Sequence, residues 1–177
     1  TSFTEPTTLF VMHSSGNHLE RGSDGGGWIE SPTKSSPQQL TLTPVGQGYY
    51  SIQVAGKQQF LSLTGQWNST FAANASADEA LWAIEAASGK FVKLRCKANN
   101  KYLGTDSNDG HQKGYTNKEG NDVKHLWYFS DNVRQSLPAD TARYMVSPQV
   151  VRQRFDVWGV SLCWWAGQCG KWSDKKI

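Results

Sequence analysis

Apolar residues recur along the first three quarters of the chain with a spacing of 42 residues. Leu19, Leu61 and Leu103 hold this spacing, and each of them follows a ring-bearing side chain. Two further columns share the same offset, and they consist of Met12, Val54 and Cys96, and of Phe10, Ile52 and Leu94. Three columns with one offset indicate three copies of a single supersecondary unit.

Each copy has the pattern of a β-hairpin followed by a closing strand. Apolar and polar residues alternate, the chain crosses a turn that contains Gly or Asn, and a second alternating run begins. Apolar runs at 40–42, 81–84 and 126–129 close the three units, and we assign Trp82 and Trp127 in these runs to the core. The third unit is about three residues longer, which we attribute to the Gly- and Asn-rich stretch 117–121.

Three units of about four strands each predict twelve strands in a closed three-fold arrangement. One unit cannot bury its apolar face alone, whereas three units around one axis can, and closing the sheet protects its edges. The pattern therefore predicts an all-β fold, a β-trefoil with a pseudo-three-fold repeat of about 42 residues, followed by a C-terminal extension. A single helical turn is expected within 77–83.

Composition narrows the function classes. Aromatic residues make up 12% of the chain and include eight Trp, more than a small core needs, so some are available as platforms for a ligand. The net charge of +3 is scattered, and no stripe of Lys and Arg interleaves with aromatics, which argues against nucleic-acid binding. No apolar run reaches the ~18 residues of a membrane span. We expect any signal peptide to have been removed.

Two further features favour an extracellular protein. Asn68-Ser-Thr and Asn74-Ala-Ser are N-glycosylation sequons, which makes Asn68 and Asn74 candidate acceptors on a secreted protein. Three cysteines leave at least one thiol outside any disulfide within the chain. Cys163 and Cys169 either bridge a short loop, or one of them pairs with Cys96; the sequence does not choose between these pairings.

A sugar site requires a flat apolar face and a carboxylate or amide that binds vicinal hydroxyls. The outer hairpins of the first and third units combine these groups best, and the second also carries a ring, although a glycan on its sequon would block it. The candidates are Glu20, Arg21, Asp24 and Trp28 in the first unit, Trp67, Asn68 and Phe71 in the second, and Asp106, Asn108, Asp109, His111 and Tyr115 in the third. The competing interpretation is that the acids only stabilise turns, Trp28 is a core residue and His111 is an ordinary loop histidine. We expect no catalytic residues, metal or cofactor.

The region 10–131 resembles the ricin-B-like and fascin-like β-trefoils. The Gln-x-Trp triplet that is typical of ricin-type repeats is absent, and the nearest positions read Gln39-Leu-Thr, Leu81-Trp-Ala and Leu126-Trp-Tyr. Because the motif is missing, no galactose-site residue is carried over from that family.

The repeat stops after Asp131, and a polar segment at 132–140 has the composition of a linker. We therefore divide the chain into a trefoil domain at 1–136 and a linker with a truncated second module at 137–177. The segment Phe155-Asp-Val-Trp-Gly-Val-Ser-Leu-Cys-Trp-Trp-Ala166 is similar to the opening motif of glycoside hydrolase family 30, in its endo-β-1,6-galactanase-like branch. Val157 and Val160 depart from the Gly and Thr of that motif.

This resemblance implies a carbohydrate-related function without catalysis in this chain. The two carboxyl groups of a retaining glycosidase come from later barrel strands in that family, and a (β/α)₈ barrel needs ~250 residues. The leading prediction is a lectin or carbohydrate-binding module for galactose-containing glycans of the β-galactan or arabinogalactan type. The alternatives are the N-terminal fragment or processed chain of an active hydrolase, and a protein-binding trefoil. The Trp-rich tail is expected to pack on the trefoil, on a second copy, or on a second chain.

Overall fold

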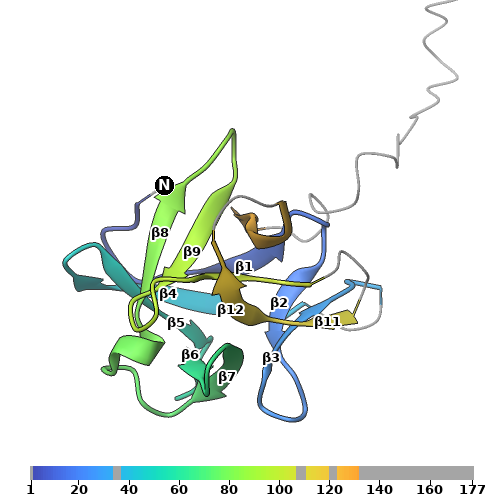
Figure 1. Ribbon diagram of the computed structural model, residues 1–177. Helices are drawn as coiled ribbons and strands as arrows, with labels where there is room; N and C mark the ends of the chain where they lie inside the picture. The colour runs from blue at the N-terminus through green and yellow to red at the C-terminus, as the bar shows by residue number, and fades with distance from the viewer. Residues whose placement is uncertain (1, 34–36, 107–110, 120–122, 132–177) are drawn as a thin grey trace, which may run out of the picture. The chain divides into compact units, whose positions relative to one another are not determined.

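The computed structural model describes residues 2–33, 37–106, 111–119 and 123–131, which form an all-β structure (Figure 1). The first repeat contains β1 (Thr7–His13), β2 (His18–Arg21), β3 (Gly27–Glu30) and β4 (Leu40–Gly46). The second contains β5 (Tyr49–Val54), β6 (Phe60–Thr64), β7 (Asn68–Ala72), the 3₁₀ turn η1 (Asp78–Ala80) and β8 (Trp82–Ala86). The third contains β9 (Val92–Cys96), β10 (Tyr102–Gly104), β11 (His111–Lys113), β12 (Tyr115–Lys118), η2 (Val123–His125) and β13 (Trp127–Ser130). Among these residues there is no helix with the length and apolar character needed to cross a membrane.

Six strands close into a barrel. The first and last strands of each repeat pair antiparallel in the cyclic order β1, β4, β5, β8, β9, β13 and back to β1. Because the ring is complete, none of these six strands presents an open edge of the kind that recruits other chains. The inner strands of the repeats form three hairpins that pair with one another across one end of the barrel. This architecture is the predicted β-trefoil.

The three hairpins meet at Gly27, Ser69 and Gly114, which occupy equivalent positions. The Ser69 hydroxyl donates a hydrogen bond to the Gly114 carbonyl at 2.6 Å, and the Gly114 N–H donates to the Gly27 carbonyl at 2.8 Å. A Cβ on Gly27 would lie 2.4 Å from the Ser69 Oγ, and one on Gly114 would lie 3.0 Å from it. The axis therefore has room for one side chain, and two of the three positions must be glycine.

The core follows the predicted columns in the hairpins and the closing strands. Leu19, Leu61 and Leu103 are all fully buried, as are Trp82 and Trp127. The Trp82 indole donates to the Leu61 carbonyl and the Trp127 indole to the Leu103 carbonyl, each at 2.9 Å. The two closing-strand tryptophans thus fill the core and tie each barrel strand to the hairpin of its own repeat.

The columns predicted for the first strand are wrong by one residue in the first repeat. Pairing with the closing strands places His13, and not Met12, in the position of Val54 and Cys96. The same shift puts Val11 in the place assigned to Phe10, and Phe10 is only half-buried. The offset here is 41 residues because the turn after His13 is one residue shorter than its counterparts.

The extra residues of the third repeat are also placed differently from the prediction. Leu103 and Gly114 are three residues further apart than Leu61 and Ser69, whereas Gly114 and Trp127 keep the spacing of Ser69 and Trp82. The insertion therefore lies between β10 and β12 and not within 117–121. It accompanies an additional strand, β11, which pairs with β3 of the first repeat. The described residues consequently contain thirteen strands where twelve were predicted.

The predicted linker and second module at 137–177, with Cys163, Cys169 and the segment similar to family 30, lie outside the described residues. Asn108 and Asp109 also lie outside them. The helical turn expected within 77–83 is present as the 3₁₀ turn η1.

Candidate functional site

Three neighbouring strands from two repeats display polar and aromatic side chains on one outer face. Glu20 on β2 lies opposite Trp28 on β3, and Trp28 lies opposite Lys113 on β11. The adjacent row consists of His18, Glu30 and His111 in the same strand order. Directly paired residues share a face of the sheet, so these six side chains lie on one face, which we call the β2–β3–β11 face; His18 and Glu30 are its two buried members. The intervening Leu19 and Ile29 point inward and belong to the core.

The centre of this face is a pair of stacked rings. The indole of Trp28 and the imidazole of His111 have centroids 4.4 Å apart and planes 16° apart. His111 Nδ1 also contacts the carboxylate of Glu30, which is buried at 7% exposure, while the His111 side chain is 51% exposed. The stack therefore has a fixed inner side and an open outer side. Residues predicted for two separate sites, Trp28 in the first repeat and His111 in the third, therefore contact each other on one face.

Asp24 holds the Trp28 indole in place through a hydrogen bond from the indole N–H. Its Oδ1 accepts hydrogen bonds from the Trp28 indole N–H at 2.8 Å and from the Gly26 backbone N–H at 2.9 Å. These two bonds, the backbone one first, lower the pKa of the Asp24 carboxyl, and the nearby Lys113 ammonium acts in the same direction. Asp24 is exposed, so the site presents an ionised carboxylate to solvent at neutral pH.

Two glycines form the floor of the site. A Cβ on Gly22 would lie 2.3 Å from Cδ1 of Trp28, so the indole rests directly on the Gly22 backbone. A Cβ on Gly26 would lie 3.2 Å from Asp24 Oδ1, 3.4 Å from Trp28 Nε1 and 3.4 Å from Cε of Lys113. A carboxylate, an indole and a lysine side chain therefore converge above a backbone that has no side chain of its own. Glycine at these positions allows the side chains of Trp28, Asp24 and Lys113 to pack directly on the backbone.

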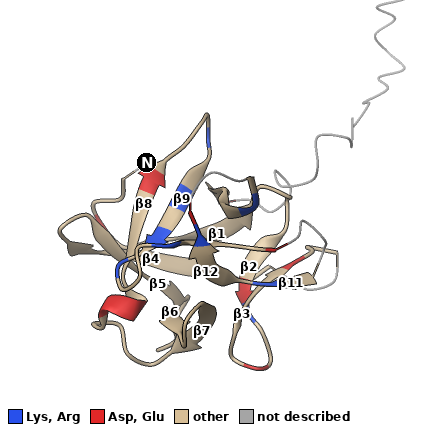
Figure 2. Cartoon of the chain, in the orientation of Figure 1, with Lys and Arg blue, Asp and Glu red and all other residues tan. Residues whose placement is uncertain are grey.

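Lys113 was missed in the sequence, as were His18 and Glu30. The Lys113 ammonium lies 5.9 Å from the centre of the Trp28 ring, within the range of a cation–π contact. His18 Nε2 bonds to Glu20 at 3.1 Å, which holds the predicted acid Glu20 at the edge of the face. No pattern in the sequence indicates the roles of Lys113 and Glu30, because they depend on β11 pairing with β3, a strand more than eighty residues earlier. Figure 2 shows the acidic residues of the β2–β3 hairpin beside the basic β11.

The remaining predicted residues are distributed over other parts of the molecule. Asp106 forms an ion pair with Lys118, away from the β2–β3–β11 face. Tyr115 is half-buried on β12, two residues beyond Lys113, and lies opposite Asn68. Phe71 is buried in the core. Trp67 is 49% exposed in the β6–β7 turn, and its carbonyl accepts the Thr116 N–H.

The two sequons differ in conformation. Asn68 begins β7, and the Thr70 hydroxyl of its sequon donates to the Gly25 carbonyl at 3.1 Å. Asn74 is exposed outside the strands, and its Oδ1 accepts the Ser76 backbone N–H and the Ser76 hydroxyl. Both asparagines are exposed, so glycosylation of either one stays a prediction.

Cys96 is a free thiol that is fully buried in the core. Burial raises its pKa, which keeps the thiol protonated, and it contacts the carbonyls of Asp78 and Glu79. A disulfide from this position would require the core to open. Its predicted partners, Cys163 and Cys169, lie outside the described residues.

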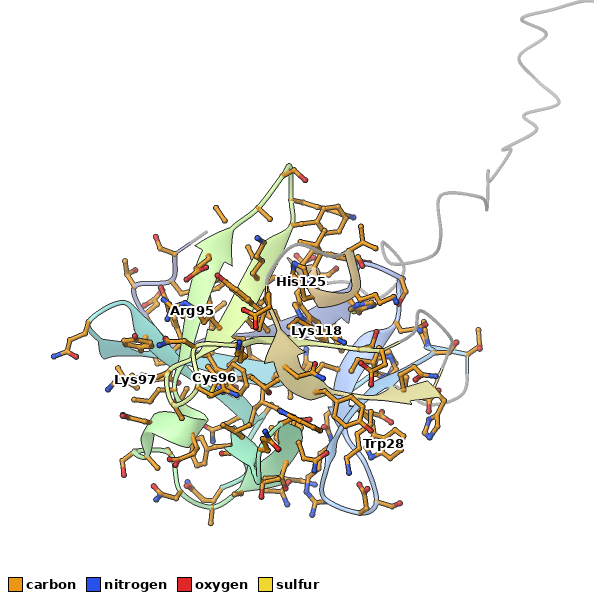
Figure 3. The ribbon with its side chains drawn as sticks, viewed as in Figure 1. Trp28, Arg95, Cys96, Lys97, Lys118 and His125 are labelled. Carbon is orange, nitrogen blue, oxygen red and sulfur yellow. The ribbon has the colours of Figure 1, made fainter. Side chains whose placement is uncertain are left out.

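Two other surface features, a group of ion pairs and a groove, contain none of the residues of the β2–β3–β11 face. Arg95 and Tyr102 both bond to Glu85, and Lys97 pairs with Asp78, so these groups are neutralised within the fold. Figure 3 places Trp28 near β11 and apart from Arg95 and Cys96 on β9 and from Lys97, which directly follows β9. A groove of about 400 Å³ lies beside Phe3 and Phe129. No cluster of three or more metal-ligating side chains exists in the described part of the chain.

Comparison with known families gives one match to this chain. Residues 36–117 match the family described as ricin-type beta-trefoil lectin domain-like, a range that begins before β4 and ends within β12. No curated protein matches the chain as a sequence.

Solved structures match over the trefoil. A designed three-fold symmetric protein, ThreeFoil, superposes with a TM-score of 0.62 at 16% identity, covering 71% of this chain and 99% of that one. The lectin of Polyporus squamosus, solved bound to the human-type influenza-binding epitope Neu5Aca2-6Galb1-4GlcNAc, gives a TM-score of 0.59 at 16% identity, over 72% of this chain and 50% of the lectin. A glycoside hydrolase family 43 β-1,3-galactosidase gives 0.62 at 10% identity, over 80% of this chain and 29% of the enzyme. At these identities the likeness establishes the β-trefoil fold.

Proposed function

We propose that this protein is a lectin-like module that binds carbohydrate on the β2–β3–β11 face. The observation that carries the proposal is the convergence of Trp28, Asp24 and Lys113 above Gly26, beside the half-exposed ring of His111. The match to a ricin-type lectin-like family supports the same class of function.

The chemistry of the face suits a polyhydroxylated ring. The Trp28–His111 stack offers an apolar surface for the C–H groups of a sugar, and the ionised Asp24 accepts hydrogen bonds from hydroxyls. Lys113, whose ammonium lies 5.9 Å from the centre of the Trp28 ring, supplies a hydrogen-bond donor. The ring stack and Asp24 are held in place by their contacts before a ligand arrives, which reduces the entropy lost on binding.

We further propose that the preferred ligands contain galactose. The supports are the similarity of residues 155–166 to the galactanase-like branch of family 30 and the occurrence of the same fold in a structure described as a β-1,3-galactosidase. Both supports are analogies of sequence and fold, and the titration described next identifies the preferred sugar.

The experiment is a fluorescence and calorimetric titration with galactose and β-1,6-galacto-oligosaccharides, accompanied by a broad glycan array. We expect Trp28→Ala to abolish binding and Asp24→Asn, which keeps the shape of the side chain, to weaken it. Trp67→Ala removes a tryptophan from the equivalent hairpin of the second repeat, where it is 49% exposed, and is expected to bind as the parent does. Far-UV circular dichroism confirms that each variant is folded. Absence of binding to every glycan on the array would overturn the proposal.

Catalysis is not part of the proposed function. The alternative, that the chain is the N-terminal piece of an active galactanase-like hydrolase, depends on residues 142–177 and on a continuation that would supply two carboxylates. We propose an extracellular location on the strength of the two sequons. The native mass of the protein from its source distinguishes the cases: a larger partner chain would favour the hydrolase, and a monomer or homo-oligomer would favour the lectin.

A further inference from the structure

The insertion in the third repeat extends the β2–β3–β11 face beyond a single sugar unit. His111, Lys113 and Tyr115 follow one another at every second position along β11 and β12, so they share one face, whereas the alternate residues Gly114 and Thr116 are buried. At ~3.3 Å per residue, the Cα atoms of His111 and Tyr115 are about 13 Å apart. One pyranose ring cannot cover both aromatic side chains.

Tyr115 occupies the position in the third repeat that Trp28 occupies in the first. The equivalence follows from the axis, because Trp28 comes directly after Gly27 and Tyr115 directly after Gly114. In the second repeat the equivalent residue is Thr70, whose hydroxyl bonds to the Gly25 carbonyl. One of these two rings, Trp28, is the direct cross-strand partner of Lys113, the other, Tyr115, lies two residues along its own strand line, and both are partly exposed.

The pairing of the strands keeps the two rings on one surface. Lys113 is the direct cross-strand partner of Trp28, and Tyr115 is two residues further along the same strand line. A diagonal neighbour of this kind lies ~7–8 Å away, which is within the reach of an extended ligand.

We propose that the β2–β3–β11 face and Tyr115 form one continuous site for an oligosaccharide, shared by the first and third repeats. One sugar unit stacks at Trp28 and His111, a second lies over Lys113 and accepts hydrogen bonds from its ammonium, and a further unit packs on Tyr115. This inference rests on the proposed carbohydrate-binding function and names the length of the ligand that the site takes. Three separate one-sugar sites, one in each repeat, are not expected, because the aromatic rings and acidic groups that a sugar site requires are distributed unequally among the three repeats.

Calorimetric titration of a size series tests the inference, with galactose and the di-, tri- and tetrasaccharides of the β-1,6 series as probes. The protein is produced without N-glycosylation, because Asn68 lies opposite Tyr115 and a glycan there would cover the ring. We expect affinity to rise from galactose to the trisaccharide and then to level off. Tyr115→Ala should weaken trisaccharide binding about tenfold while leaving galactose binding unchanged.

Tyr49→Ala serves as the matched control, because Tyr49 is a half-buried tyrosine on β5, a strand that pairs with none of β3, β11 and β12. Equal affinities for galactose and trisaccharide, or a length dependence that survives Tyr115→Ala, would overturn the extended site and leave carbohydrate binding intact. Silence of the parent protein towards every saccharide would overturn both proposals.

Discussion

The first and second repeats share one backbone plan but differ in what their hairpins present to solvent. Inward positions hold equivalent apolar residues, such as Leu19 and Leu61. Outward positions differ: Trp28 corresponds to Thr70, and Asp24 corresponds to Gln66. The core therefore constrains half of each hairpin, and the other half is available for function.

The difference is reinforced by how each hairpin uses its polar groups. In the second repeat the hydroxyls of Ser62 and Thr70 bond to backbone carbonyls, and Ser62 is buried. In the first repeat Asp24 orients Trp28 while remaining exposed. The first hairpin also gains a partner strand, β11, from the insertion in the third repeat. The face that we propose for sugar binding thus exists only because the three-fold symmetry is broken.

The largest expected effect concerns the closing strands, where Leu40 in the first repeat corresponds to Trp82 in the second. Trp82→Leu would make the two repeats alike, at the cost of a cavity and of the hydrogen bond to the Leu61 carbonyl. We expect a loss of about 3 kcal/mol in the free energy of unfolding, measured by urea denaturation. A loss below about 1 kcal/mol would show that the barrel collapses onto the smaller side chain.

The packing at the three-fold axis can be tested by exchanging Gly27 of the first hairpin and Ser69 of the second. Gly27→Ser should destabilise the fold by about 1–3 kcal/mol, because the new Cβ meets the Ser69 Oγ at 2.4 Å. The double variant Gly27→Ser with Ser69→Gly returns one side chain to the axis and should recover most of that loss. A double-mutant cycle with no coupling between the two sites would contradict this account of the axis.

Gly22→Ala tests whether the orientation of Trp28 matters separately from its presence. The added methyl group would lie 2.3 Å from the indole and displace it from Asp24 and His111. We expect saccharide affinity to fall about tenfold, or about 1.4 kcal/mol, in a calorimetric titration. Ser23→Ala, on the exposed turn next to Gly22, is the control and should bind normally. Unchanged affinity in Gly22→Ala would mean that the stack tolerates movement.

The smallest effect concerns His13, which occupies the position of Val54. Burial lowers the pKa of His13, with His125 adding to the effect and the bond to the Lys124 carbonyl opposing it. The unfolded chain takes up a proton below its pKa of about 6.5, whereas the native state does not until a lower pH, so the free energy of unfolding decreases as pH falls from about 6.5. The slope has an upper limit of about 1.4 kcal/mol per pH unit.

His13→Val should flatten this dependence between pH 7.5 and 5.5, as followed by urea denaturation at each pH. The bond from the Thr105 N–H to the Lys124 carbonyl is retained, so that carbonyl is not left unpaired. An identical pH dependence in the parent and the variant would assign the acid sensitivity to other groups.

The apolar columns were sufficient to predict the trefoil, because burial imposes the same periodicity on every repeat. The closing-strand tryptophans were correctly assigned to the core for the same reason. The error in the first strand arose at the turn after His13, where one residue fewer shifts the register by one. A buried histidine gives no apolar signal, so its place in the column could not be recognised from the sequence.

The sequence predicted several residues of the candidate site, but not that they come together on one face. Trp28, Asp24 and His111 were each selected because an acid and a ring lie close together in the chain, which is a local property of the sequence. That His111 stacks on Trp28, and that Lys113 reaches over the same ring, depends on the pairing of β11 with β3. The sequence alone determined the repeat, the core and the residue types that suit a sugar. Only the tertiary structure decided which of them meet, because contacts between strands distant in sequence are set by the closure of the whole fold.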